Sequence, residues 1–241
     1  MPKKPRYRGI RRTATRDALM AAAEELFGLQ GFADVSVDEI TARAGVAKGS
    51  FYNHFTDKAD LAHHLALEIR AGMREQIGTL RASSSDDPAV HVAISMGSFM
   101  LLAIERPSRA LILVNLLSNP TDAASPMNAR VRSTLQAGMS SGRFRMASIE
   151  SALVLVLGIV AAGIRDLLEQ RVKDPDQRIA ELVAHGLCAL GLDWSEAYES
   201  IASPTVRRLR LKGATGVTRV EKPHGAIAAA PGRRGSAEPR K

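Results

Sequence analysis

The chain has 241 residues, of which 45% are hydrophobic and 24% are charged, and its formal net charge is +8. A chain of this length and apolar content can bury a core, which excludes disorder throughout. Its single cysteine, Cys188, excludes an intrachain disulfide and a cysteine-rich zinc site, and it suits a reducing cytoplasm.

The two ends of the chain differ in charge from its body. Residues 1–12 carry six basic and no acidic side chains, residues 204–241 carry ten basic and two acidic ones, and the residues between them have a net charge of −6. Basic segments around a folded body usually follow a polyanion, nucleic acid more often than membrane, by releasing its counter-ions. We therefore expect the basic arm 1–12 to add DNA contacts. Residues 204–241 are rich in Gly, Pro and Arg without periodicity, which predicts a disordered tail; a solubilising role is the alternative for this tail.

No segment predicts export or membrane insertion. Residues 1–9 are charged and lack the apolar run of a signal peptide. The longest apolar stretch, 152–164, is shorter than the roughly 18 to 20 apolar residues that span a bilayer. We interpret it as a buried helix and expect a cytoplasmic protein with no membrane partner.

Hydrophobic periodicity predicts an all-α fold. Apolar residues recur at three- and four-residue spacings, and no segment alternates with the period of a strand. The first predicted helix, 13–29, buries one apolar stripe. Gly31 follows it, where a left-handed C-terminal cap is favoured, and Phe32 can fold back onto the helix.

Residues 36–55 have the pattern of a helix-turn-helix. Ser36 and Glu39 are spaced as in a capping box, which predicts the start of a short helix that ends at Gly45. A third helix is predicted over 47–55. Two short helices joined by a glycine-containing turn are typical of DNA-binding domains, in which the second helix lies in the major groove.

The predicted third helix carries side chains of the kinds that bind DNA. Phe51 and Phe55, four residues apart, face the core and leave the polar side chains on the other faces. Ser, Asn, His and Tyr donate to base edges or phosphates, and a lysine neutralises a phosphate. Taken singly, Tyr52 is as often a packing residue, and His54 could be a surface histidine. The pattern selects Lys48, Gly49, Ser50, Tyr52, Asn53 and His54.

Further helices are predicted downstream. One from Lys58 to Arg81 begins after Asp57 and connects the first domain to the second, and the polar linker 83–88 ends it. The others are predicted at 88–105, 107–118, 126–141, 148–172 and 175–191, with a short one near 194–202.

Over residues 13–61, the sequence resembles the tetracycline-repressor family. The segments from Phe32 to Ile40 and from Ala44 to Lys58 are similar to the DNA-binding signature of that family. The resemblance implies a transcriptional regulator, a repressor that binds a palindromic operator as a homodimer and is released by a small-molecule effector. It also implies a helix-turn-helix domain over 13–57 and a helical ligand-binding and dimerisation domain over 58–203.

The resemblance assigns roles to single residues as well. It implies that the six residues selected above lie at the DNA, with Tyr52, Lys58 and Thr41 at phosphates. Asp38 departs from members of the family that carry a base-reading basic residue there. An acid could read a cytosine amino group, whereas solvation or stabilisation by the helix dipole is the competing interpretation.

The second domain gives less specific signals. Segment 152–164 has more apolar residues than one buried stripe needs, so we expect it to pair with 176–192 and their symmetry mates in a four-helix bundle; a core helix of a monomer is the alternative. An aromatic content of 4% favours an aliphatic or acyl-like effector over a cationic one. The candidate pocket residues are Met96, Phe99, Met100, Leu116 and Met127, with Asn115, Arg165, His64 or His91 as polar anchors.

Two other functions compete with a regulator. No Gly-rich phosphate loop, His-x-x-x-His pair or nucleophile elbow indicates an enzyme, and His63 and His64 lack a third metal ligand at a recognisable spacing. We therefore expect no enzyme activity, no cofactor and no metal. A DNA-coating or nucleoid-organising protein would use the same fold and depend more on its basic tail. Activation in place of repression also stays open, because the sign of regulation depends on the position of the operator.

Overall fold

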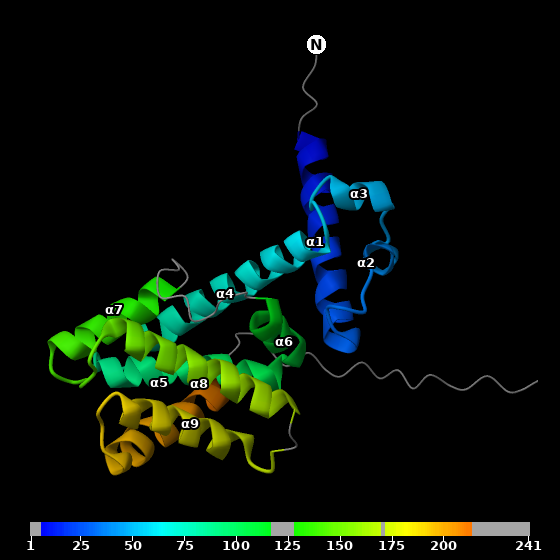
Figure 1. Cartoon of the computed structure of the whole chain (residues 1–241). Coiled ribbons are helices and arrows are strands. Elements are labelled where there is room, and N and C mark those ends of the chain that lie inside the picture. Colours follow the sequence, from blue (N-terminus) through cyan, green and yellow to red (C-terminus); the bar gives the residue numbers. More distant parts are fainter. Residues whose placement is uncertain (1–5, 117–127, 170–171, 214–241) are drawn as a thin grey trace, which may run out of the picture.

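The computed structural model describes residues 6–116, 128–169 and 172–213, which form helices without a strand among them (Figure 1). The first three helices are α1 (Arg6–Gln30), α2 (Val37–Ala44) and α3 (Lys48–Tyr52). The remaining helices are α4 (Lys58–Ala82), α5 (Pro88–Glu105), α6 (Pro107–Leu116), α7 (Ala129–Ser140), α8 (Ile149–Glu169), α9 (Pro175–Ala189), the π-helical η2 (Ser195–Ala202) and α10 (Ser203–Lys212). The all-α prediction is confirmed.

Helices α1 to α3 share a small core next to the start of α4. Its largest fully buried side chains, Phe27, Ile40 and Phe51, come from three different helices. Gly31 has a φ of 86°, in the left-handed region, and ends α1 as the sequence predicts. The ring of Phe32 then lies 5.4 Å from that of Phe27, so the chain folds back onto the helix it has just left.

The start and end of α2 follow from its caps. The Ser36 backbone N–H donates to Glu39 Oε2 at 2.8 Å, and the Glu39 backbone N–H donates to Ser36 Oγ at 3.2 Å, which confirms the predicted capping box. Gly45 has a φ of 66°, and its N–H donates to Ala42 O at 3.2 Å. These caps fix the angle at which the chain enters α3.

Helix α5 is the centre of the second domain. It packs against α4, α6, α7, α8, α9 and α10 and lies among them in the helical body (Figure 1). Asp87 caps it by accepting from the Ala89 N–H at 2.8 Å, and Pro88 occupies its first position. Arg143 donates to both oxygens of Asp87, at 3.0 and 2.8 Å, and so ties the α7–α8 connection to the start of α5.

Two helices join the domains. Helix α4 runs from the helix-turn-helix into the helical body, and α6 packs against both α1 and α4 (Figure 1). Arg109 of α6 donates to the two carboxylate oxygens of Glu24 of α1, at 2.5 and 3.1 Å. Gly28 of α1 allows a close approach there, because a Cβ on it would lie 1.9 Å from Ser108 Oγ.

By length and composition, α5 and α8 are each long and apolar enough to cross a membrane. In α5, 61% of the apolar window is buried inside the protein, as expected for a core helix. In α8 the buried share is only 33%, and Val154 on its surface is 53% exposed. Helix α8 therefore carries apolar residues that the described part of the chain leaves partly uncovered.

The structure corrects several predicted boundaries, and α3, which was predicted over 47–55, ends at Tyr52. Helix α1 begins at Arg6 and not near residue 13, so residues 6–12 of the predicted basic arm form its first turns. Helix α10 covers Ser203–Lys212, where disorder was predicted from residue 204. Val206 and Leu209 of α10 are buried against α5 at Gly97, where a Cβ would lie 3.0 Å from the Leu209 side chain. The rest of the predicted tail, 214–241, lies outside the described residues.

Candidate DNA-binding surface and ligand cavity

Helix α3 holds its polar side chains at the surface of the first domain. Phe51 and Phe55 are buried with ring centroids 5.7 Å apart, and they anchor the short helix to the core. Tyr52 is 55% exposed, and its ring meets the Phe51 ring edge-on at 5.3 Å, so packing fixes an aromatic side chain that solvent still reaches. Four of the six predicted DNA-binding residues are exposed, Lys48, Gly49, Tyr52 and Asn53, and two are half-buried, Ser50 and His54.

An ion pair joins α2 to α3. Lys48 Nζ lies 2.8 Å from Asp38 Oδ1, and both side chains are more than half exposed. The hydrogen bond to Asp38 and its negative charge raise the pKa of Lys48, so the ammonium is charged at neutral pH. Burial, together with the charges of Arg12 and Arg16, lowers the pKa of His54, which favours the neutral imidazole. His54 can thus offer one donor and one acceptor at this surface.

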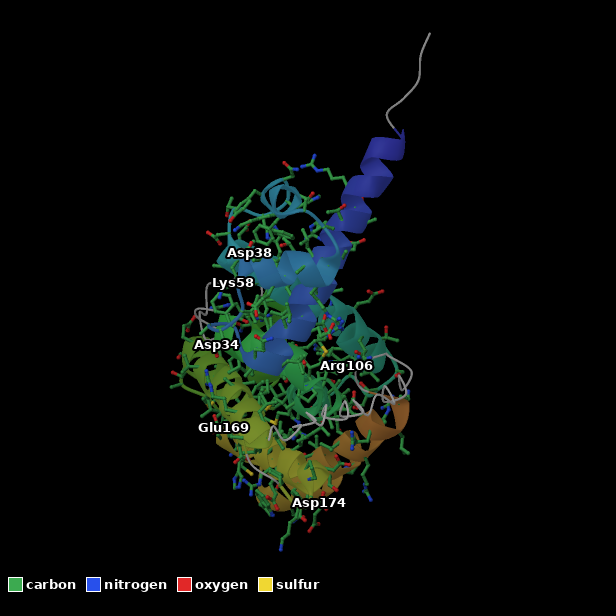
Figure 2. The ribbon with its side chains drawn as sticks, turned by 90° about the vertical axis from the view of Figure 1, so that its right-hand side faces the viewer. Asp34, Asp38, Lys58, Arg106, Glu169 and Asp174 are labelled. Atoms are coloured by element: carbon green, nitrogen blue, oxygen red, sulfur yellow. The ribbon has the colours of Figure 1, made fainter. Side chains whose placement is uncertain are left out.

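Thr41 and Lys58, which were predicted to contact phosphates, both form hydrogen bonds within the protein. Thr41 is only 5% exposed, and its hydroxyl donates to Asp38 O at 3.0 Å. Lys58 Nζ donates to three backbone carbonyl oxygens, those of Phe32 and Val35 at 2.6 Å and that of Ala33 at 3.2 Å. An ammonium has three N–H donors, and all three are engaged with the loop beside Asp34 (Figure 2). Lys58 therefore holds the α1–α2 loop.

A cavity of about 80 Å³ lies between α4, α5, α7 and α8. Its lining is mainly apolar, and the guanidinium-bearing residues come from α4 and α7. A second cavity of about 60 Å³ shares four of these residues and reaches α6 through Leu113 and Val114. The shared residues are Arg70, Phe99, Leu157 and Val160. The two cavities are thus neighbours around the half-buried ring of Phe99.

Two of the predicted pocket residues, Met96 and Phe99, line the first cavity. Met100 is fully buried, and its Sδ lies 3.3 Å from where a Cβ on Gly163 would stand, so it packs α5 against α8 and lines neither cavity. Arg165 is exposed on α8 and lines neither cavity. The side chains of Asn115 and Leu116, and all of Met127, lie outside the described residues.

The polar residues that line the first cavity were not predicted from the sequence: Arg70, Arg74, Ser95, Arg130 and Thr134. On α4 a signal for them exists, since Arg70, Arg74 and Arg81 follow a spacing of four and seven residues and so share one helix face. Arg70 Nη2 donates to Asn128 Oδ1 at 3.2 Å. Burial, and then the charge of Arg74, lower the pKa of Arg70, though a guanidinium stays protonated.

Two family profiles match the chain in sequence. Residues 19–65 match the bacterial regulatory proteins of the tetR family, and residues 87–203 match the tetracyclin repressor-like C-terminal domain. The HTH-type transcriptional repressor DhaR of Mycobacterium sp. (strain GP1) is 32% identical over 77 residues, which are 32% of this chain and 39% of that protein. The repressor BepR of Brucella suis biovar 1 (strain 1330) is 35% identical over 74 residues, 31% of this chain and 34% of that protein. These matches span well under half the length of either relative.

Solved structures share the fold over most of the chain. RolR in complex with the ligand resorcinol has a TM-score of 0.63 at 23% identity, and the match covers 79% of this chain and 94% of that one. A gamma-butyrolactone receptor (ArpA-like protein) has a TM-score of 0.57 at 19% identity, and the match covers 84% of this chain and 99% of that one. The matched family and the curated relatives are transcriptional regulators and not enzymes. With the helix-turn-helix matched by one profile and the helical second domain by the other, the chain belongs to the tetR family of bacterial regulatory proteins.

Proposed function

We propose that this protein is a cytoplasmic transcriptional repressor that binds a palindromic operator as a homodimer and releases it when a small molecule enters the second domain. Ser50 of α3 and the two residues after the helix, Asn53 and His54, read the DNA. Lys48 neutralises a phosphate, and Gly49 leaves room for close approach. Tyr52 bonds a phosphate through its hydroxyl, and the exposure of its ring supports this role. The DNA-coating alternative draws no support from the curated relatives, which are repressors.

The observation that carries the release mechanism is that α4 contacts the DNA-binding domain at its start and lines the cavity further along. At its start, Lys58 holds the loop between α1 and α2 through three carbonyl oxygens. Roughly three to five turns later, the same helix lines the cavity with Arg70, Arg74 and Ile77. A ligand that binds one position of α4 better than another therefore shifts the reading helix as well.

Dimerisation completes the proposal, because one helix-turn-helix reads one half-site. The partly uncovered apolar face of α8 supplies an interface, and α9 packs beside it. Two copies related by a twofold axis present their α3 helices to half-sites about 34 to 36 Å apart, and a small rotation of α4 changes that separation. The solved complex of RolR with resorcinol supports a small molecule as the effector.

The test compares the affinity of the protein for its own upstream DNA with that for unrelated duplex at matched salt. Tyr52→Phe removes one hydroxyl at the proposed phosphate contact and should weaken specific binding by about 1.5 kcal/mol per half-site, which is roughly a hundredfold in the Kd of the dimer for a two-half-site operator. Tyr198→Phe removes the same group from η2 in the second domain and should leave the affinity unchanged.

Footprinting separates the two candidate functions. A repressor protects one palindrome, and its protection disappears with Tyr52→Ala. A coating protein protects DNA without a boundary, with equal affinity for both duplexes, and that result would reject the proposed repressor.

A further inference from the structure

Three arginines, Arg70, Arg74 and Arg130, line one side of the ligand cavity, and a fourth, Arg81, donates to Thr134 in its lining. Arg70, Arg74 and Arg81 share a face of α4, and Arg130 of α7 stands opposite, with Nη1 3.1 Å from where a Cβ on Gly78 would lie. Arg70 and Arg81 are half-buried, whereas Arg74 and Arg130 are exposed. The cavity thus has an interior guanidinium, that of Arg70, and two more toward solvent.

Within the described part of the chain, no carboxylate forms an ion pair with any of these four guanidinium groups. The two half-buried ones have neutral partners. Arg70 donates to the Asn128 amide oxygen, and Arg81 Nη2 donates to Thr134 Oγ1 at 2.7 Å. Elsewhere in the protein, arginines pair with acids, as Arg109 does with Glu24.

The arginines also repel one another. After burial, the charge of Arg74 is the cause that lowers the pKa of Arg70, and the charge of Arg130 has the same effect on Arg81. Partly desolvated like charges without counter-ions destabilise a folded protein, whereas a bound anion would neutralise them. The cluster therefore has the electrostatics of an anion site that opens into an apolar cavity.

We infer that the cavity binds a compact carboxylate, an aromatic or short aliphatic acid, whose carboxylate group pairs with Arg70 and whose apolar body packs against Met96, Phe99 and Val156. This inference rests on the proposed function and specifies its effector. A planar guanidinium matches a carboxylate through two parallel hydrogen bonds. Cavities of about 80 and 60 Å³ exceed the space of a single water and suit a single ring or short chain.

The experiment measures ligand binding by the full-length protein without DNA, by thermal shift and calorimetry at constant ionic strength. The probes are benzoate with its neutral isostere benzamide, and hexanoate with hexanamide. Each acid should raise the Tm and bind at least about tenfold more tightly than its amide, because only the acid gains the charge-assisted pair. Arg70→Gln should remove this preference, and Arg165→Gln, which changes an exposed arginine outside the cavity, should preserve it.

Arg70→Lys keeps the charge but loses the two-pronged geometry, so it should bind benzoate with intermediate affinity and fold as the unaltered protein does. Amides that bind as tightly as the acids, undiminished benzoate binding by Arg70→Gln, or no acid binding up to about 10 mM would each overturn the inference. Operator release is measured separately. Release by the amides alone would keep the proposed function and reject the carboxylate, whereas acid binding without release would keep the anion site and reject its role as the effector site.

Discussion

At the scale of single residues, the ammonium group of Lys58 holds the DNA-binding domain together. It donates to three carbonyl oxygens of the loop between α1 and α2 and lies 4.5 Å from the centroid of the Phe32 ring. Carbonyl groups in a loop have no helical partner, so a cation that bonds three of them fixes both the loop and the start of α4. Lys48 has a different environment from Lys58, because its ion pair with Asp38 lies at the exposed surface.

Lys58→Met tests whether this lysine positions the domain or contacts phosphate. The variant leaves carbonyl oxygens without a donor and should lower the free energy of unfolding by about 1 to 3 kcal/mol. It should weaken operator binding without changing the slope of log K against log salt. Lys48→Met is the matched variant: it should preserve stability and reduce that slope by about two, because one phosphate in each of the two half-sites is no longer neutralised. A reduced slope in Lys58→Met would show instead that Lys58 binds phosphate.

The sequence revealed local residue roles but not this one. Ser36, Glu39 and Gly45 are recognised because capping depends on neighbours within a few positions. The carbonyl partners of Lys58 lie 23 to 26 residues earlier in the chain, and a lysine has the same signature whether it faces loop or DNA. The arginines of the cavity were missed for the same reason, since their lack of acidic partners among the described residues is a property of the folded arrangement.

At the scale of helices, α6 is the second connection between cavity and DNA-binding domain. Its Leu113 and Val114 line the smaller cavity, while Ser108 and Arg109 contact α1. The approach at Gly28 is so close that a Cβ would lie 2.4 Å from Ser108 Cβ and 3.2 Å from Ser108 Cα. A rotation of the Ser108 hydroxyl does not relieve those contacts, so the helices would have to separate.

Gly28→Ala should therefore destabilise the protein, although alanine favours helix. We expect a loss of about 1 to 3 kcal/mol from overpacking between α1 and α6, and a changed operator affinity because α1 carries the reading domain. Gly72→Ala on α4 is the control, since nothing lies within 4 Å of its Cβ position, and it should stabilise by about 0.5 to 1 kcal/mol. Denaturant unfolding measures the free energy of unfolding of both variants. An equal increase in the two would show that α1 and α6 accommodate the added methyl group without loss of stability.

The helices themselves follow from the sequence where their caps are local. The predicted helix 88–105 matches α5, and 175–191 exceeds α9 by two residues. Helix α10 was not predicted, because Pro204 was interpreted as the end of the preceding helix. The apolar signal of its buried side is also weak, since Val206 and Leu209 are surrounded by basic residues. Proline is tolerated in a first helical turn, and the contacts of α10 with α5 stabilise the helix.

At the scale of the whole molecule, the apolar face of α8 decides between monomer and dimer. The helix is long and apolar, yet only a third of its apolar window is buried by the described residues of one chain, and Val154 is 53% exposed. Monomeric soluble proteins rarely leave such a surface in water. In a twofold dimer, the same face of each copy covers the other, so each substitution in it acts twice.

Val154→Glu should consequently shift the protein toward monomers, because two unpaired carboxylates would enter the interface at a cost of several kcal/mol. Sedimentation velocity across a concentration series measures the shift, and operator affinity should fall with it, since one helix-turn-helix retains a single half-site. Leu211→Glu is the control, because Leu211 is 89% exposed near the end of α10 and its substitution should leave the dimer intact. A dimer as strong in Val154→Glu as in the unaltered protein would move the interface away from this part of α8, and the spacing of the two α3 helices would then have to be set by other elements.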